Sequence, residues 1–360
     1  MKFLFVIDSL GSGGSQRQMI NLAVALKKRG NEVSFLVYHP NIFYADELRK
    51  FEIRVNQINE QNYFLRLIKM RKRIRASNAD VVLSFLEAPN FICEVAGLPW
   101  RKWKLIVSER SANPEALKSI KAKIMKQFHV LADFVITNTH ANRNLIRKIV
   151  PFLRQSKLRV IYNFVDLDTF KPIKDYSYKR NGKLHLLIAS SHQYLKNLNG
   201  LVEGLALLDN QMREKIKIIW YGDRRDDSLE VAKRKIEYLG LSDNFDFYPA
   251  VREINLAMQQ ADVLGIFSFH EGFPNAICEA MACGKPVISS EIGDLPMHIK
   301  VEQMLFMPDD PRSIADVLKY ILNLSEEELC AIGKTNFNYA SKNFSENRIV
   351  NEYLQILRQA

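Results

Sequence analysis

The stretch that decides the fold covers residues 269–288 and reads FHEGFPNAICEAMACGKPVI. It holds two carboxylates, Glu271 and Glu279, which are eight residues apart. Glu271 closes an apolar, strand-like run over Val263–Phe269. Glu279 lies on a short amphipathic segment that Gly284-Lys285-Pro286 ends before the next strand. A strand that ends in a carboxylate, followed by a helix with outward N-terminal amides, can hold a ligand with hydroxyl and phosphate groups. The stretch therefore indicates either a ligand site in an α/β domain or an ordinary strand-turn-helix.

Strand-like apolar runs alternate with helical patterns along the whole chain. In the first half the runs are Lys2–Ile7, Glu32–Val37, Val81–Ser84, Leu105–Ser108 and Phe134–Thr137. In the second half they are Leu184–Ala189, Ile216–Tyr221, Asp246–Tyr248, Val263–Phe267 and Val287–Ser290. This order predicts parallel sheets with right-handed crossovers, and a length of 360 residues favours two domains. We expect the two to join near Asn163–Asp175, and residues 345–360 to form a final amphipathic helix.

The composition is that of an ordinary globular protein, with 47% apolar and 25% charged residues. No run reaches the roughly 18 apolar residues that a membrane span needs. The N-terminus is typical of a buried first strand rather than of a secretory signal. The four cysteines have no metal-ligand spacing, and we expect reduced core thiols, which favours the cytoplasm. They are Cys93, Cys278, Cys283 and Cys330.

The net charge of +11 belongs to the first half of the chain. Residues 1–170 hold 28 lysines and arginines against 14 acidic residues, whereas the rest holds 23 against 26. Basic clusters of this kind suit anionic lipid headgroups or nucleic acid, although a solvated helix face is the plain alternative. Interleaved apolar residues favour a membrane surface over a nucleic-acid groove. The clusters and these residues are Lys69–Arg75, Trp100–Lys104, Lys118, Lys121, Lys123, Lys126, Ile68, Ile74, Ile120 and Ile124.

Other segments give weaker signals. A glycine turn, Gly11–Gly14, follows the first strand, and a helix start there would favour an anion, although a tight turn is equally consistent. Lys196 lies in the loop after the first strand of the second half and could meet a diphosphate, although by itself a loop lysine is more often an ordinary surface residue. The acidic loop Asp223–Asp227 is best interpreted as a polar loop, because its arginines oppose metal binding. The histidines have no metal spacing, and serine-hydrolase and P-loop motifs are absent from the sequence.

Together these motifs resemble the family-4 retaining glycosyltransferases of the GT-B fold, over nearly the whole chain. The most specific part runs from Glu271 to Val287 and is similar to that family's E-x7-E signature with its trailing E-A-M-A-x-G-x-P-V. Asn163–Asp166 with Phe170 resembles an interdomain N-G-V-D…F segment. The resemblance implies two doubly wound Rossmann-like domains facing a cleft. Residues 1–165, with 345–360 packing back on them, would bind the acceptor, and residues 166–344 the nucleotide-sugar donor.

The resemblance also implies roles for individual residues. Glu279 would bond the ribose, Glu271 would face the donor sugar, and Lys196 would hold the diphosphate, aided by the glycine turn. The other donor-binding positions implied are Gly13, Gly14, Ser191, Val251, Arg252, Phe273, Pro274, Asn275, Ala276 and Ile277. A lysine and helix-terminal amides would stabilise the negative charge that develops on the departing diphosphate, without a metal or other cofactor.

Three departures from the family pattern matter. Ser190-Ser191 stands where the family usually has Gly-Arg ahead of the diphosphate lysine, so Arg252 or Arg110 would supply the second charge, or Lys196 would act alone. Gln16 replaces the usual acidic residue after the glycine turn. The first-domain strand that often ends near a histidine ends here at Glu109, our candidate for the acceptor-side base.

The sequence thus predicts a retaining, metal-independent hexosyltransferase. It would move a sugar from a nucleotide diphosphate sugar, UDP-linked by our expectation, to a lipid-linked or glycan acceptor in cell-surface polysaccharide biosynthesis. We expect it in the cytoplasm, peripherally on the anionic inner face of the membrane, with no nucleic-acid partner. Two alternatives stay open: a nucleotide-sugar epimerase of similar shape, and a nucleotide-sugar-binding protein without turnover.

Overall fold

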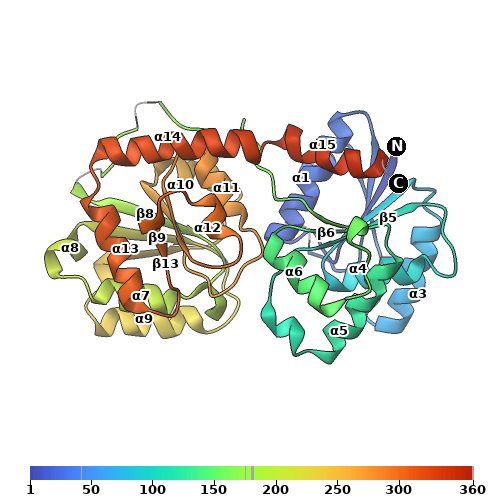
Figure 1. Ribbon diagram of the computed structural model, residues 1–360, viewed down its shortest axis with the longest axis horizontal. Helices are drawn as coiled ribbons and strands as arrows, with labels where there is room; N and C mark the ends of the chain where they lie inside the picture. The colour runs from blue at the N-terminus through green and yellow to red at the C-terminus, as the bar shows by residue number, and fades with distance from the viewer. Residues whose placement is uncertain (42, 175, 180–181, 359–360) are drawn as a thin grey trace. The chain divides into compact units, whose positions relative to one another are not determined.

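The computed structural model describes residues 1–41, 43–174, 176–179 and 182–358, and the chain divides into two compact units (Figure 1). Unit 1 comprises Met1–Asn163 and Glu346–Ala360, and unit 2 comprises Phe164–Ser345. Asp175, at the end of the expected junction, and residues 359–360 of the expected last helix lie outside the described residues.

Unit 1 is built on a parallel sheet with the strand order β3-β2-β1-β4-β5-β6-β7. Its described strands are β1 Lys2–Val6, β2 Glu32–Val37, β3 Arg54–Gln57, β4 Val81–Phe85, β5 Lys104–Glu109, β6 Phe134–Thr137 and β7 Leu158–Val160. Its described α-helices are α1 Gly14–Lys28, α2 Ala45–Lys50, α3 Tyr63–Arg75, α4 Glu87–Ala96, α5 Ile120–Gln127, α6 His140–Ile149 and α15 Glu346–Arg358.

Unit 2 repeats this architecture with the order β10-β9-β8-β11-β12-β13. Its described strands are β8 Leu184–Ala189, β9 Ile216–Tyr221, β10 Phe245–Tyr248, β11 Val263–Ile266, β12 Val287–Ser290 and β13 Leu305–Phe306. Its described α-helices are α7 Leu198–Ala206, α8 Asn210–Glu214, α9 Ser228–Tyr238, α10 Ile254–Gln260, α11 Asn275–Ala282, α12 Leu295–His298, α13 Pro311–Asn323 and α14 Glu326–Asn343.

The central strands read as continuous apolar runs because helices cover both faces of each sheet. All five residues of β4 and all four of β11 are buried. In each sheet the first strand lies in the middle, and the chain winds outward first on one side and then on the other. The strand order therefore reverses beside β1 in unit 1 and beside β8 in unit 2. Such a switch point, at the carboxyl ends of the strands, is where open α/β sheets bind ligands.

The last helix, α15, packs within unit 1. Its apolar face, which includes Ile349, Tyr353 and Leu357, is buried. Arg29 donates a hydrogen bond of 2.6 Å to the Asn347 side chain, and Lys104 donates one of 2.7 Å to the Leu357 carbonyl oxygen. These contacts attach the end of the chain to α1 and β5.

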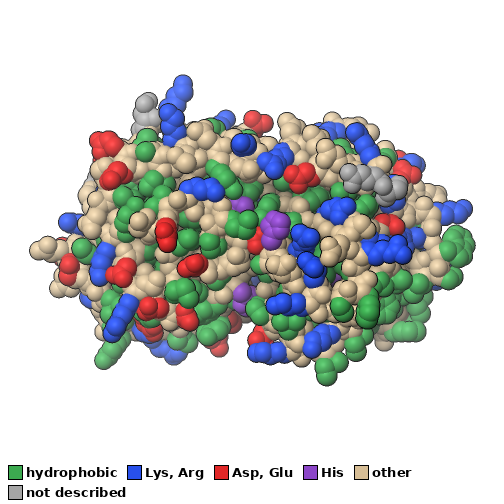
Figure 2. All heavy atoms as spheres, in the orientation of Figure 1, with side chains coloured by type: hydrophobic (Ala, Val, Ile, Leu, Met, Phe, Trp, Pro, Cys, Tyr) green, Lys and Arg blue, Asp and Glu red, His purple; other side chains and the backbone are tan. Residues whose placement is uncertain are grey.

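The fold buries some of the side chains that the sequence assigned to the basic clusters of unit 1. Ile74 and Trp103, which the sequence placed among the basic clusters, are buried. Figure 2 shows hydrophobic side chains gathered over the region of α3, α4 and α5, with basic side chains near them.

Cys93, Cys278 and Cys283 are buried free thiols as expected, but Cys330 is exposed, so the prediction of four core thiols is wrong there. Among the described residues, no helix is long and apolar enough to cross a membrane.

Candidate functional site

The switch point of unit 2 brings together the two loops that carry Lys196 and Glu271. Lys196 ends the short 3-10 turn Tyr194–Lys196 after β8, and Glu271 follows β11, the neighbouring strand. The Phe269 amide donates a hydrogen bond of 3.0 Å to the Leu195 carbonyl oxygen and so joins the loops directly. The strand order, rather than proximity in sequence, therefore makes these residues neighbours.

Lys196 and Glu271 form an ion pair at this edge, Nζ to Oε1, with side chains that are 13% and 16% exposed. The Ser268 hydroxyl donates a second hydrogen bond to the same carboxylate oxygen, at 2.7 Å. Both charges are thus held in a fixed place while part of each remains open to solvent. A partly buried lysine paired with a carboxylate can exchange that partner for a phosphate.

Asn197 fixes the backbone that presents Lys196. It adopts the left-handed conformation, with φ of 57°, and caps α7 by accepting a hydrogen bond of 3.1 Å from the Gly200 amide. Its side-chain amide also donates a bond of 2.6 Å to the Pro308 carbonyl oxygen. The loop is therefore anchored to α7 and to the segment after β13.

Helix α11 follows Glu271 and begins at Asn275 without a side-chain cap. Its first amides therefore offer an anion-binding end. Phe273 is buried and its ring packs 4.9 Å from the His298 ring and 5.2 Å from the Phe344 ring. Glu279 lies on the second turn and is only 4% exposed. Pro274, Ala276 and Ile277 lie along the same start of the helix, so the structure groups these sequence-predicted residues.

Ser191, which stands in place of the family arginine, belongs to a tightly packed loop. Its hydroxyl accepts a hydrogen bond of 2.9 Å from the Gln193 side chain. The preceding Ser190 carbonyl oxygen accepts one of 2.8 Å from the Trp220 ring nitrogen. Gly222 lets this backbone pass, since a Cβ there would lie 1.9 Å from the Ser190 oxygen. Loop packing, rather than charge, dominates this position.

A cavity of about 320 Å³ opens beside the Lys196 loop. Its walls include Tyr194, Phe269, Asn199 and Glu203, and the two aromatic ring centroids lie 5.3 Å apart. The volume is at the small end of the range for ligand cavities. The sequence did not single out this aromatic pair, because its members come from loops after different strands.

The remaining unit 2 candidates lie in loops at the same edge of the sheet. Val251 and Arg252 are exposed between β10 and α10. The Tyr221 and Tyr248 rings, which the sequence did not flag, stack at 4.9 Å at the ends of β9 and β10. In the acidic loop, Asp226 accepts bonds from the Tyr194 and Ser228 amides at 2.8 and 2.9 Å, which confirms a polar loop with a structural role.

In unit 1 the glycine turn precedes α1, which begins at Gly14 with no side-chain cap on Gly13. Gln16 donates a hydrogen bond of 3.0 Å to Asp8, two residues after the end of β1. A Cβ on Gly13 would lie 2.2 Å from the Gln16 side-chain oxygen, so the glycine leaves room for this contact. The turn follows β1, as the sequence predicted, and the strand order puts it at the switch point of unit 1.

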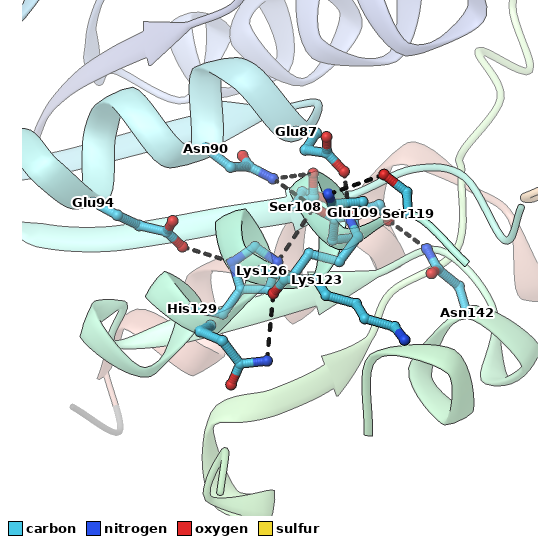
Figure 3. Close-up of polar contacts among 12 residues, drawn as sticks. Glu87, Asn90, Glu94, Ser108, Glu109, Ser119, Lys123, Lys126, His129 and Asn142 are labelled. Atoms are coloured by element: carbon cyan, nitrogen blue, oxygen red, sulfur yellow. Dashed lines mark hydrogen bonds and ion pairs between the residues drawn. The ribbon is translucent and has the colours of Figure 1, made fainter. Parts of the chain in front are cut away.

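Glu109 lies inside a buried polar network of unit 1 (Figure 3). Its carboxylate pairs with Lys126, and the His129 Nε2 lies 3.3 Å away. Lys126 also pairs with Glu87 at 3.2 Å, and His129 Nδ1 lies 2.6 Å from Glu94. These side chains come from β5, α4, α5 and the turn that follows α5, so the network ties four segments together.

The electrostatics of this network do not suit a general base. Burial alone raises the pKa of Glu109, but the Lys126 ammonium and the His129 ring outweigh it and hold that pKa well below its usual range. Burial lowers the pKa of His129, but Glu94 and Glu109 raise it to about 9. A buried carboxylate that holds two cations accepts a proton poorly, so the geometry favours a structural role for Glu109.

The Arg110 side chain also has its partners within unit 1. Its side chain is buried, donates a hydrogen bond to the Asn163 side-chain oxygen, and lies 4.5 Å from the centroid of the Phe85 ring. It therefore does not suit a second diphosphate cation. Across the described residues, His, Cys, Asp and Glu form no group of three or more placed to hold a metal ion.

Comparisons with known proteins agree with this architecture. Residues 12–169 match the family model "Glycosyltransferase Family 4", and residues 171–337 match "Glycosyl transferases group 1". HepE of Anabaena, solved with UDP and glucose, superposes with a TM-score of 0.87 at 19% identity, covering 100% of both chains. The sucrose-phosphate synthase of Thermosynechococcus elongatus gives 0.82 at 19% identity, over 100% of this chain and 99% of that one.

The chain is a GT-B glycosyltransferase, similar to family 4 and group 1.

Two curated relatives of this glycosyltransferase catalyse different transfer reactions. One is the Campylobacter jejuni α-1,4-N-acetylgalactosaminyltransferase that acts on a GalNAc-GalNAc-diNAcBac-PP-undecaprenol, 24% identical over 100% of this chain and 99% of that protein. The other is the N-acetyl-α-D-glucosaminyl L-malate synthase of Bacillus anthracis, 23% identical over 95% and 92%. Neither is an epimerase or a non-catalytic binding protein, so the alternatives from the sequence are not favoured.

Proposed function

We propose that this glycosyltransferase moves a hexosyl group from a UDP-linked sugar to a lipid-linked glycan acceptor, with retention and without a metal. The E-x7-E interpretation of Glu271 and Glu279 is part of this proposal. The C. jejuni relative acts on a lipid-diphosphate-linked glycan, and HepE is solved with UDP, which supports the two substrate classes.

The observation that carries the proposal is the Lys196–Glu271 pair at the switch point of unit 2. A cation there, beside the uncapped start of α11, suits a diphosphate. On donor binding, Lys196 would move from Glu271 to the diphosphate, and the freed carboxylate would face the sugar. Glu279 would bond the ribose, and the exposed loop with Val251 and Arg252 would meet the base, with Arg252 as the candidate second cation.

In the proposed reaction the bond between the anomeric carbon and the diphosphate oxygen breaks, and the acceptor hydroxyl oxygen bonds that carbon on the same face. The hydroxyl proton passes to the departing diphosphate oxygen, so no separate base is needed in unit 1. Lys196 and the α11 amides would stabilise the charge that grows on the diphosphate, and Glu271 the positive charge on the sugar.

The test is a transfer assay with UDP-sugars and polyprenyl-diphosphate-linked acceptors, with the anomeric configuration of the product read by NMR. Lys196→Ala and Glu271→Ala should each lower kcat by about 10²–10³-fold. Lys217→Ala is the matched control. Lys217 also forms an ion pair, with Asp246 at 2.8 Å, but this pair lies near the amino ends of β9 and β10, away from the carboxyl ends that carry the site. Full activity of Glu271→Ala would refute the site.

The same assay separates the alternatives. Conversion of the UDP-sugar with no acceptor present would indicate an epimerase, and UDP binding with no transfer to any acceptor would indicate a binding protein. An inverted product would overturn retention, and loss of activity on EDTA treatment, restored by a divalent metal, would overturn metal independence. We also propose that the enzyme works in the cytoplasm, on the inner face of the membrane, because that is where UDP-sugars and lipid-diphosphate acceptors would meet.

A further inference from the structure

Unit 1 carries exposed apolar side chains on two helices that flank α4. On α3, Phe64 is 67% exposed and Ile68 is 50% exposed; on α5, Ile120 is 75% and Ile124 is 58% exposed. Each pair has a spacing of four residues, which places both members on one side of its helix. Apolar side chains exposed singly are ordinary, but four of them on two helices that flank α4 indicate a surface that meets an apolar partner.

Helix α4 joins the two ridges into one surface, since it contacts both α3 and α5. Three of its four half-buried residues, Ala88, Phe91 and Val95, are apolar and recur at intervals of three and four; the fourth, Glu87, pairs with the buried Lys126. The Phe91 ring lies edge-on to the Phe128 ring, with centroids 4.9 Å apart, just after α5. Figure 2 shows hydrophobic side chains over this part of unit 1.

The loop after α4 extends the same surface toward α3. Arg71 donates a hydrogen bond of 2.7 Å to the Leu98 carbonyl oxygen, and the Arg75 guanidinium lies 5.2 Å from the Trp100 ring centroid. Leu98 and Trp100 are 39% and 61% exposed. An exposed tryptophan beside arginine is typical of the boundary between water and a bilayer.

Cations surround this surface. Two of the nearby lysines are neutralised, Lys69 by Glu60 and Lys118 by Glu115. Four more are exposed and, within the described residues, have no carboxylate partner; they are Lys72, Arg73, Lys121 and Lys123. The surface therefore combines an apolar centre with an excess of positive charge. Anionic lipid headgroups above acyl chains match both properties at once.

We propose that α3, α4 and α5 form a docking face for an anionic membrane surface, with Phe64, Ile68, Ile120 and Ile124 entering the headgroup region. The inference rests on the proposed function, since a lipid-linked acceptor would be met at that surface. It goes further by assigning the contact to specific residues of unit 1 and by separating it from the donor site of unit 2.

The experiment measures co-sedimentation of the full-length protein with phosphatidylcholine vesicles that contain or lack phosphatidylglycerol. The wild type should bind only the anionic vesicles. Lys72→Gln/Lys121→Gln should lower the partition coefficient by a factor of about 30, and Phe64→Ser/Ile120→Ser by about tenfold or more. The matched controls are Phe152→Ser, 86% exposed elsewhere in unit 1, and Lys215→Gln/Lys334→Gln in unit 2; both should bind like the wild type.

Thermal unfolding of each variant confirms that it is folded, and transfer to a short-chain, water-soluble acceptor tests the reaction apart from the membrane. Docking variants that keep this transfer but lose vesicle binding support the proposal. It is overturned if the wild type ignores anionic vesicles, if the controls lose binding equally, or if the substitutions dissociate a dimer instead. Transfer without vesicle binding refutes docking alone, and vesicle binding without transfer refutes the proposed function alone.

Discussion

Lys126→Met tests how the buried network of unit 1 holds together. The Lys126 and Glu109 side chains are each only 5% exposed and form an ion pair, and Glu87 adds a second carboxylate at 3.2 Å. Removing one partner of a buried pair costs about 3–5 kcal/mol, because the other charge is left without compensation. His129 Nε2 lies 3.3 Å from Glu109 and supplies a remaining cation, so we expect the lower part of that range.

Calorimetry on the full-length protein provides the assay. For a unit of this size, each kcal/mol shifts the transition by about 2–4 °C, so Lys126→Met should lower it by about 6–16 °C. The double variant Lys126→Met/Glu109→Gln should recover much of the loss, because it removes both charges. Lys118→Met is the control, since its exposed pair with Glu115 should contribute less than about 1 kcal/mol.

The reasoning is refuted if Lys126→Met costs no more than the Lys118→Met control. It is also refuted if the double variant is less stable than the single one, because Glu109 would then depend on contacts other than its charge pair. Either result would reopen Glu109 as a group that can change its protonation at modest cost, as a general base must.

Three further predictions concern stability, each measured by unfolding of the full-length protein. The pKa of His129 is raised to about 9, so its contribution is complete below pH about 6.5 and is lost by about 9; stability should fall across that window by about 3 kcal/mol, and His129→Gln should remove the slope. Gly222→Ala should cost about 1–3 kcal/mol, because its Cβ would displace the Ser190 carbonyl, and unchanged stability would show that the loop yields freely. Asn197→Ala should cost about 2 kcal/mol through the lost cap and the strained left-handed backbone, whereas Asn197→Gly should cost less.

The sequence predicts the central strands well and the outer strands poorly. The ranges expected for β2, β6, β8, β9 and β12 agree with the structure residue for residue. Three of the four edge strands, β3, β7 and β13, were missed, and β7 and β13 span three and two residues; the fourth, β10, was expected one residue short. Edge strands bury little apolar surface, so no continuous apolar run marks them.

For the candidate site, the sequence predicts individual residues but not how they pair. Lys196 and Glu271 were found through motif resemblance, but their pairing follows from the position of β8 beside β11, which local patterns do not encode. For Glu109, the sequence predicts the position but not the contacts. Its strand and its position at the strand end were predicted, yet its partner Lys126 lies 17 residues away on a helix, so burial and pairing were hidden.

The buried network and the proposed docking face meet at α4. Its inner side is tied to the sheet by polar contacts: Asn90 accepts a hydrogen bond of 2.7 Å from Ser84 and donates one of 3.0 Å to the Ser108 carbonyl oxygen, while Glu94 holds His129. Buried charges of this kind contribute little net stability compared with apolar packing, but they accept only one orientation of their partners. An apolar core would let α4 rotate or slide, whereas this network fixes which residues face outward. If that is the role of the network, Lys126→Met should weaken vesicle binding as well as stability, although Lys126 itself is buried. Unchanged vesicle binding by a folded Lys126→Met variant would separate the two features.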